Sequence, residues 1–145
     1  MSHHCKAALI TCEDFRLHQR KDGRNYIAEF IKTLGCDCDL ITRGGGVQDL
    51  VRPEQDGYAG SFLRDLNVSA SLHQADTIYL INHENCGAYG SFNFLSRDDE
   101  LEKHYDDLRK AKEIILEKVP DKNVLLFFGE LEPDSGDVFV IKEIK

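Results

Sequence analysis

Two kinds of segment are missing from this sequence of 145 residues. No apolar run approaches the length needed to span a bilayer, and the N-terminus lacks the basic and then apolar regions of a signal peptide. Positive charge is also scarce, since 18 lysines and arginines stand against 26 aspartates and glutamates and leave a net charge of −8. We therefore expect a cytoplasmic protein whose partners include neither a membrane nor a nucleic acid.

The sequence also lacks internal repeats, low-complexity segments and any sign of a second domain. Its length suits one sizeable core, and a content of 41% hydrophobic and 30% charged residues is ordinary for a globular chain. We expect one domain over residues 1–145.

Five cysteines are an odd number for a chain with no export signal, which favours free thiols or metal ligands over disulfides. Cys12 and Cys86 each follow an apolar run, and His83 lies three residues before Cys86. Open α/β sheets place their sites at the carboxyl ends of strands. Two thiolates and one imidazole suit Zn²⁺, and three protein ligands leave a fourth tetrahedral position for water. The alternative for any one cysteine is a buried core thiol, which we favour for Cys36 and Cys38 at the other end of their strand.

An acidic and a basic residue follow the first of these ligands. Asp14 lies two residues after Cys12, and Arg16 lies two residues further on. The spacing predicts an ion pair beside the open coordination position, in which Arg16 keeps the carboxylate of Asp14 ionised and off the metal. This pair favours a catalytic zinc site over three unrelated core residues.

Hydrophobic periodicity predicts strands that alternate with helices. Short apolar runs predict strands at residues 6–12, 36–42, 76–82 and 123–128, and alternation predicts an edge strand at residues 137–144. Helical spacing predicts helices at residues 24–34, 61–75 and 97–119 and a short helix from residue 87. Residues 13–23 indicate a loop, and residues 47–60 a loop or a broken helix. This order predicts an α/β fold with a mainly parallel central sheet of about five strands, the last one antiparallel, flanked by helices.

Other polar residues near the motifs receive structural interpretations. His104 lies in a charged part of the longest helix, where we expect it to be solvated. His18 and Tyr89 are either proton relays or, as we favour, surface or packing residues. Glu84 and Asn85 are expected to do no more than shape the turn between the ligands.

Together these motifs resemble those of the β-class carbonic anhydrases. That family has Cys-x-Asp-x-Arg after its first strand and His-x-x-Cys-Gly after its third, matching residues 12–16 and 83–87 here. Residues 43–46, Arg-Gly-Gly-Gly, stand where the family has Arg-Asn-Ala-Gly, and residues 128–136 resemble its final hairpin. The resemblance covers nearly the whole chain.

The resemblance implies a zinc lyase that reversibly hydrates CO₂ to bicarbonate. Zinc lowers the pKa of its bound water and supplies the hydroxide that attacks CO₂. The implied site residues are the zinc ligands Cys12, His83 and Cys86, the catalytic pair Asp14 and Arg16, and the substrate-loop glycines Gly44, Gly45 and Gly87. In this scheme the carboxylate, held by the arginine, accepts the hydrogen bond of the hydroxide. Family habit also implies a homodimer or a higher homo-oligomer.

Two departures from the family pattern leave other functions open. Family members usually carry a helical arm before the first strand, whereas this sequence starts a few residues before it, and Gly44 and Gly45 replace the usual Asn and Ala. A related zinc hydrolase of carbon disulfide or carbonyl sulfide uses the same ligands. A non-catalytic homologue that binds zinc or bicarbonate is the third interpretation.

Overall fold

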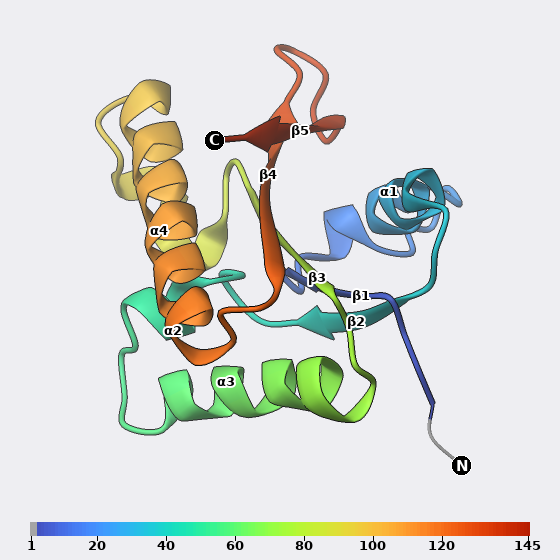
Figure 1. Ribbon diagram of the computed structural model, residues 1–145. Helices are drawn as coiled ribbons and strands as arrows, with labels where there is room; N and C mark the ends of the chain where they lie inside the picture. Colours follow the sequence, from blue (N-terminus) through green and yellow to red (C-terminus); the bar gives the residue numbers. More distant parts are fainter. Residues whose placement is uncertain (1–2) are drawn as a thin grey trace.

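A computed structural model describes residues 3–145, except for the side chain of Phe92, and its centre is one β-sheet (Figure 1). The strands are β1 (Ala7–Thr11), β2 (Cys38–Thr42), β3 (Thr77–His83), β4 (Asn123–Leu131) and β5 (Phe139–Ile144). They lie in the order β2-β1-β3-β4-β5, with the first four parallel and β5 antiparallel to β4. This confirms the predicted α/β fold, including the antiparallel last strand.

Helices connect the parallel strands. The α-helices are α1 (Tyr26–Leu34), α2 (Gln48–Val51), α3 (Tyr58–Asn67) and α4 (Arg97–Lys118), and α3 continues into a π-helical segment, η2 (Val68–Leu72). Short 3₁₀ turns are η1 (Phe15–Leu17), η3 (Gly87–Tyr89) and η4 (Ser91–Asn93). Among residues 3–145, no helix is both long and apolar enough to cross a membrane.

The sheet is covered on both faces (Figure 1). Side chains of α2, α3 and α4 pack on one face in a cluster that includes Leu50, Phe62, Leu108 and Phe128. The other face is covered by α1 and η1, which contribute to a second cluster. Because β1 and β3 lie between neighbouring strands and under helices on both faces, their carboxyl ends are fixed in position.

Several boundaries differ from the prediction by a few residues. The segment 47–60, predicted as a loop or a broken helix, contains α2 and the first residues of α3. The second strand begins at Cys38 rather than at Cys36. The fourth strand extends to Leu131, because Glu130 and Leu131 pair with Val140 and Phe139 of β5. The extension of β4 therefore depends on a contact with a segment that is distant in sequence.

The expectation that His104 is solvated is wrong. Its side chain is fully buried between α4 and the sheet, 3.9 Å from the ring of Tyr89 and 5.2 Å from that of Phe128, measured between centroids. Two charged residues of the same helix, Glu100 and Asp107, are buried as well, and His104 lies one turn before Leu108 on the buried face. Burial lowers the pKa of this imidazole, which favours its neutral form.

Candidate metal centre

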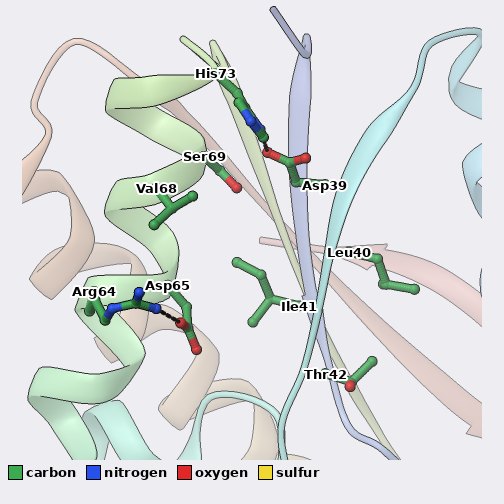
Figure 2. A pocket seen from close by; sticks show the side chains of 9 residues that line it. All are labelled: Asp39, Leu40, Ile41, Thr42, Arg64, Asp65, Val68, Ser69 and His73. Atoms are coloured by element: carbon green, nitrogen blue, oxygen red, sulfur yellow. Dashed lines mark hydrogen bonds and ion pairs between the residues drawn. The ribbon is translucent and has the colours of Figure 1, made fainter. Parts of the chain in front are cut away.

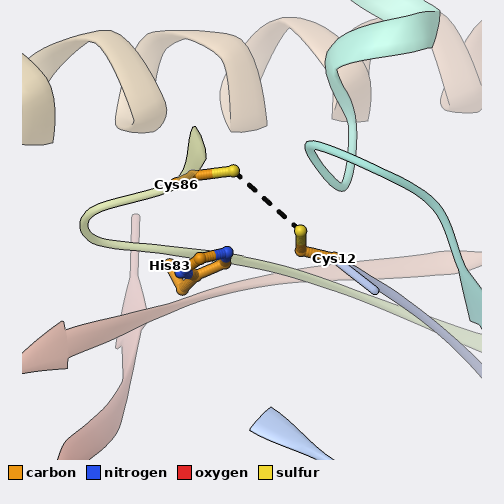
Figure 3. A group of neighbouring side chains, drawn as sticks. All are labelled: Cys12, His83 and Cys86. Atoms are coloured by element: carbon orange, nitrogen blue, oxygen red, sulfur yellow. Dashed lines mark hydrogen bonds between the residues drawn. The ribbon is translucent and has the colours of Figure 1, made fainter. Parts of the chain in front are cut away.

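The end of β1 and the turn after β3 bring three side chains together (Figure 3). β1 and β3 are parallel neighbours with Thr11 opposite Ile81, so Cys12 leaves its strand beside the end of β3, where His83 lies. One ligand atom from each of Cys12, His83 and Cys86 lies within 4.8 Å of the other two. The three residues are 4%, 1% and 2% exposed, respectively. The structure therefore clusters the three residues that were predicted as metal ligands.

The imidazole of His83 is held in the tautomer that a metal ligand needs. Its Nδ1 donates a hydrogen bond to the carbonyl oxygen of Glu84 at 2.9 Å, which leaves a lone pair on Nε2. Nε2 is buried, and within the described residues it has no hydrogen-bond partner. A buried polar atom without a partner is costly. A metal ion at this cluster would satisfy it.

The two sulfur atoms interact directly, with Cys12 Sγ and Cys86 Sγ 3.9 Å apart. A hydrogen bond from Cys86 lowers the pKa of Cys12 to about 4, against the effect of burial. The pKa of Cys86 is raised, first by this bond to Cys12 and then by burial. The two sulfurs therefore share one proton, which a bound cation would displace. Two sulfurs and one imidazole nitrogen make a donor set that fits Zn²⁺.

Asp14 and Arg16 form the predicted ion pair beside this cluster. Arg16 donates from Nη2 to Asp14 Oδ2 at 2.8 Å and from Nε to Oδ1 at 3.0 Å, and the backbone N–H of Arg16 donates to Oδ1 at 2.9 Å. Burial raises the pKa of Asp14, but the hydrogen bonds from Arg16 outweigh it, so the net pKa is below the usual range. Oδ2, the oxygen that accepts from Arg16 Nη2, also lies 3.8 Å from His83 Nε2. An ionised carboxylate therefore stands next to the unpartnered nitrogen.

Asn85 anchors the far side of the Arg16 guanidinium, a contact that sequence reasoning missed. Nη1 of Arg16 donates to Asn85 Oδ1 at 3.1 Å, and Nη2 donates to the Asn85 carbonyl at 2.9 Å. The backbone of Asn85 is left-handed, with φ of 60°, and asparagine tolerates this conformation better than most residues. That preference is the one signal in the sequence that singles out Asn85. Its contacts go beyond the predicted shaping of the turn.

Two acidic residues connect the turn between His83 and Cys86 to α4 and β4. The carboxylate of Glu84, 7% exposed, accepts from Arg97 Nη2 at 3.1 Å and from the N–H of Leu131 at 2.7 Å. Glu100 of α4 accepts from the N–H of Asn85 at 2.6 Å. Sequence reasoning could not assign these bonds, because each joins the ligand turn to a distant element.

The glycine loop, residues 43–46, lies just before α2, and Asn82 connects the end of this loop to β3. Asn82 Oδ1 accepts from the N–H of Val47 at 3.3 Å, and Asn82 Nδ2 donates to the hydroxyl of Tyr89 at 3.1 Å. Gly46 has φ of 58°, and a Cβ atom at this position would collide with Asn82 Oδ1. Only glycine therefore fits the close approach of this loop to β3.

The three glycines predicted for the substrate loop have different surroundings. The N–H of Gly45 donates to Cys12 Sγ at 3.4 Å, which places it against a predicted ligand. Gly44 is half-buried near Glu13, and Gly87 is exposed directly after Cys86. A role in substrate binding stays a prediction for all three.

His18 and Tyr89 each make a hydrogen bond to another part of the chain. His18 Nε2 donates to the carbonyl oxygen of Cys12 at 2.8 Å. Tyr89 is 8% exposed, and its hydroxyl donates to Asp107 at 2.8 Å. Burial raises the pKa of Tyr89, which keeps its hydroxyl protonated.

A hollow of about 480 Å³ lies between β2 and the α3–η2 helix (Figure 2). Polar side chains on its wall are paired with each other: His73 Nδ1 lies 2.6 Å from Asp39 Oδ2, and Arg64 donates to Asp65 at 3.1 Å. None of the predicted site residues lines it. We therefore place the functional site at the Cys12 cluster instead.

Comparison with known proteins identifies the family. Residues 2–134 match a family model described as "Putative carbonic anhydrase". The chain belongs to this family. It is 30% identical over 140 residues to an uncharacterized protein of Rickettsia conorii, covering 92% of this chain and 72% of the relative. An uncharacterized protein of Rickettsia bellii is 29% identical over 130 residues, covering 86% and 76%.

Solved structures show the same fold as this family member. The β-carbonic anhydrase of Aspergillus fumigatus has a TM-score of 0.59 at 12% identity, covering 99% of this chain and 76% of that one. Carbonic anhydrase from Streptococcus mutans gives 0.55 at 17% identity, with 99% and 84% covered. A carbon disulfide hydrolase gives 0.51 at 16% identity, with 93% and 81% covered. The β-carbonic-anhydrase-like fold is thereby shown, in agreement with the resemblance of the motifs.

Proposed function

We propose that this protein is a zinc-dependent carbonic anhydrase that interconverts CO₂ and bicarbonate. The observation that carries the proposal is the buried Cys12–His83–Cys86 cluster, whose unpartnered Nε2 faces a carboxylate clamped by arginine. A structural zinc site would have four protein ligands, whereas these three leave one position free. Membership of the family supports the same activity.

Cys12, His83 and Cys86 would hold the zinc ion. When bound, zinc lowers the pKa of water and so supplies a nucleophile near neutral pH. The N–H of Gly45 stabilises the thiolate of Cys12, and the carbonyl of Glu84 keeps the His83 lone pair directed away from its Nδ1 proton. These contacts keep the donor atoms ready for the metal before it binds.

Asp14 and Arg16 would orient the nucleophile. The ionised carboxylate can only accept hydrogen bonds. It would accept one from the attacking water or hydroxide, so that a lone pair on the oxygen of this nucleophile is directed at the carbon of the substrate. Arg16 occupies both carboxylate oxygens and is itself tied to Asn85, which keeps Asp14 from moving onto the metal. In this proposal the open coordination position depends on the Asp14–Arg16–Asn85 contacts.

A zinc hydrolase of carbon disulfide or carbonyl sulfide is the second candidate. It is supported by the shared fold of the carbon disulfide hydrolase, and the chemistry needs the same three ligands. A non-catalytic protein that binds zinc or bicarbonate is the third. Rates with CO₂, carbon disulfide and carbonyl sulfide under identical conditions separate the three candidates.

The test is stopped-flow CO₂ hydration on metal-analysed protein from about neutral to mildly alkaline pH. We expect about one zinc per chain, and loss of both zinc and activity in Cys86→Ser. Cys36→Ser is the matched control, since it removes a thiol outside the cluster and should change neither quantity. Full zinc occupancy without CO₂ hydration would refute the carbonic anhydrase and favour one of the other two candidates.

We also propose that the protein assembles as a homodimer or a higher homo-oligomer. Phe15, next to Asp14, is 73% exposed, and Leu95 is 97% exposed. β2 is also an edge strand of the sheet, and an edge strand offers unpaired backbone groups that a second chain can cover. Sedimentation velocity at micromolar concentration tests the assembly, and a monomer at that concentration would contradict it.

A further inference from the structure

His104 is fully buried on α4 but takes no part in the chemistry proposed above. Its ring lies between the rings of Tyr89 and Phe128, with centroids 3.9 Å and 5.2 Å away. Its Nε2 atom makes no hydrogen bond to any residue that the structure describes, a condition that it shares with Nε2 of His83. A metal ion would satisfy the nitrogen of His83, whereas the buried nitrogen of His104 needs a different explanation.

The hydrogen bonds of Asn82 fix which nitrogen of His104 carries the proton. Asn82 Oδ1 accepts from the N–H of Val47, which identifies the other atom of this amide as the nitrogen Nδ2. Nδ2 has two hydrogens, and it lies 3.1 Å from the hydroxyl oxygen of Tyr89 and 3.1 Å from His104 Nδ1. An amide nitrogen only donates, so Nδ1 of His104 is the acceptor and carries no proton. The imidazole is therefore neutral, with its proton on Nε2.

The Nε2–H group of His104 lies near a buried carboxylate one turn earlier on α4. Nε2 is 3.9 Å from Oε1 of Glu100, a residue that is 6% exposed. The same Oε1 atom accepts from the N–H of Asn85, the residue directly before the ligand Cys86. A polarised N–H group next to a carboxylate is favourable where water is excluded. Glu100 therefore connects His104 to the turn that carries Cys86.

His104 thus stands between the supports of two ligands that come from different strands. On one side Asn82 holds the glycine loop, whose Gly45 donates to Cys12 Sγ at 3.4 Å. On the other side Glu100 holds the turn before Cys86. The two sulfurs are 3.9 Å apart although 74 positions of sequence separate them. Their spacing therefore depends on contacts between the two supports.

We propose that His104 is a positioning residue of the metal centre, which couples the loop beside Cys12 to the turn of Cys86 and so keeps both sulfurs at the spacing that a metal ion needs. Its neutral Nε2–H tautomer does this by accepting from Asn82 and placing its N–H beside Glu100. Loss of the imidazole leaves one hydrogen of Asn82 without an acceptor, and the glycine loop then loses its fixed position. This inference rests on the proposed zinc site but not on the reaction catalysed there.

Zinc affinity, measured on the full-length protein by competition with a chelator of known affinity, tests the coupling. His104→Phe keeps a ring between Tyr89 and Phe128 but removes both nitrogens, and should lower zinc affinity about tenfold. His104→Gln supplies an amide acceptor and an amide donor, so it should restore zinc affinity to within about twofold of wild type. Leu108→Ala is the matched control, because it destabilises the same buried face of α4 without removing a polar group. It should leave zinc affinity unchanged.

A double variant tests whether His104 acts through Asn82. Asn82→Ala already breaks the connection, so the addition of His104→Phe should cause little further loss. We expect a total loss of about tenfold, whereas two independent effects would multiply to about 100-fold.

The tautomer is measured separately by long-range ¹H–¹⁵N NMR of the zinc-loaded protein. The His104 signals are those that His104→Gln removes. They should show a proton on Nε2 and none on Nδ1 from about pH 6 to 8.

Four results would overturn the inference. They are wild-type zinc affinity in His104→Phe, an equal loss of affinity in Leu108→Ala, independent effects in the double variant, and a proton on Nδ1. None of them contradicts the proposed carbonic anhydrase, which stands if the wild type binds zinc and hydrates CO₂. Conversely, a zinc-loaded wild type without CO₂ hydration would refute that reaction, while the expected affinities and tautomer would still support the role of His104.

Discussion

Replacing Asn85 with glycine should weaken the support of Arg16 while leaving the backbone conformation in place. Asn85 has φ of 60°, which glycine adopts freely. The substitution removes the bond from Arg16 Nη1 to Asn85 Oδ1 at 3.1 Å but keeps the bond from Nη2 to the Asn85 carbonyl at 2.9 Å. A hydrogen bond from a charged donor contributes about 1.5–3 kcal/mol. Because the side chain of Arg16 is partly exposed, we expect about 1.5 kcal/mol, the lower limit.

A double-mutant cycle measures this contact without reference to activity. Urea unfolding of the wild type, Asn85→Gly, Arg16→Gln and the double variant gives the coupling free energy between the two side chains. The cycle cancels the entropy that glycine adds to the unfolded chain, about 0.4–1 kcal/mol. We expect a coupling of about 1.5 kcal/mol. In CO₂ hydration, Asn85→Gly should lower kcat/KM by about three- to tenfold with zinc content unchanged, because Arg16 then holds Asp14 less firmly.

Asn85→Ala is the control for the backbone. It removes the same oxygen but also places an alanine at positive φ, at an additional cost of about 1 kcal/mol. The coupling to Arg16 should be the same as for Asn85→Gly, although the total destabilisation is larger. If Asn85→Gly and Arg16→Gln were additive within about 0.3 kcal/mol, or if Asn85→Gly retained full kcat/KM, the proposed support of Arg16 by Asn85 would be refuted.

Three other predictions follow from the same geometry. Arg16→Ala should lower CO₂ hydration because it frees Asp14 to bind the zinc, and a crystal structure of that variant with water still on the zinc would contradict this. The pKa of Asp14 is lowered in the folded state, so its contribution to stability should be present above about pH 4 and lost as the pH falls through the folded-state pKa. The free energies of unfolding of wild type and Asp14→Asn, measured in urea from about pH 5 to 2, should therefore converge at the acidic end. Gly46→Ala should lower the free energy of unfolding by about 2–3 kcal/mol through its collision with Asn82, whereas Gly23→Ala, which has φ of 87° and open space around it, should cost only the backbone strain of about 1 kcal/mol.

The parts of the site that follow one another closely in sequence could be predicted without the structure. Asp14 and Arg16 lie within one turn of the chain, and a strand that ends before each ligand is visible as an apolar run. Because β1 and β3 are parallel neighbours in the sheet, their carboxyl ends lie side by side. Apolar runs that each end at a ligand therefore indicate, in the sequence, which residues come together.

The residues that support the site could not be predicted, because their partners are distant in sequence. His104 has charged neighbours, and nothing local shows that Tyr89 and Phe128 enclose it. Glu84 acquires its partners only when Arg97 and Leu131 have been brought to it by the fold. A polar residue that is buried through tertiary contacts has the same local pattern as an exposed one.

Asn82 supports the loop next to the ligand Cys12, whereas Asn85 supports the carboxylate of Asp14 through Arg16. Asn82 accepts a hydrogen bond from Val47 at the end of the glycine loop, whose Gly45 contacts Cys12, and in the described part of the chain its hydrogen bonds do not reach Arg16 or Asp14. Asn82→Ala should therefore lower zinc affinity, by about tenfold if it behaves like other residues behind metal ligands, measured by competition with a chelator of known affinity. Asn85→Gly, by contrast, should leave zinc affinity unchanged and lower only the rate. Equal effects of both variants on zinc affinity would show that the loop and the Asp14–Arg16 pair hold the metal centre as one unit.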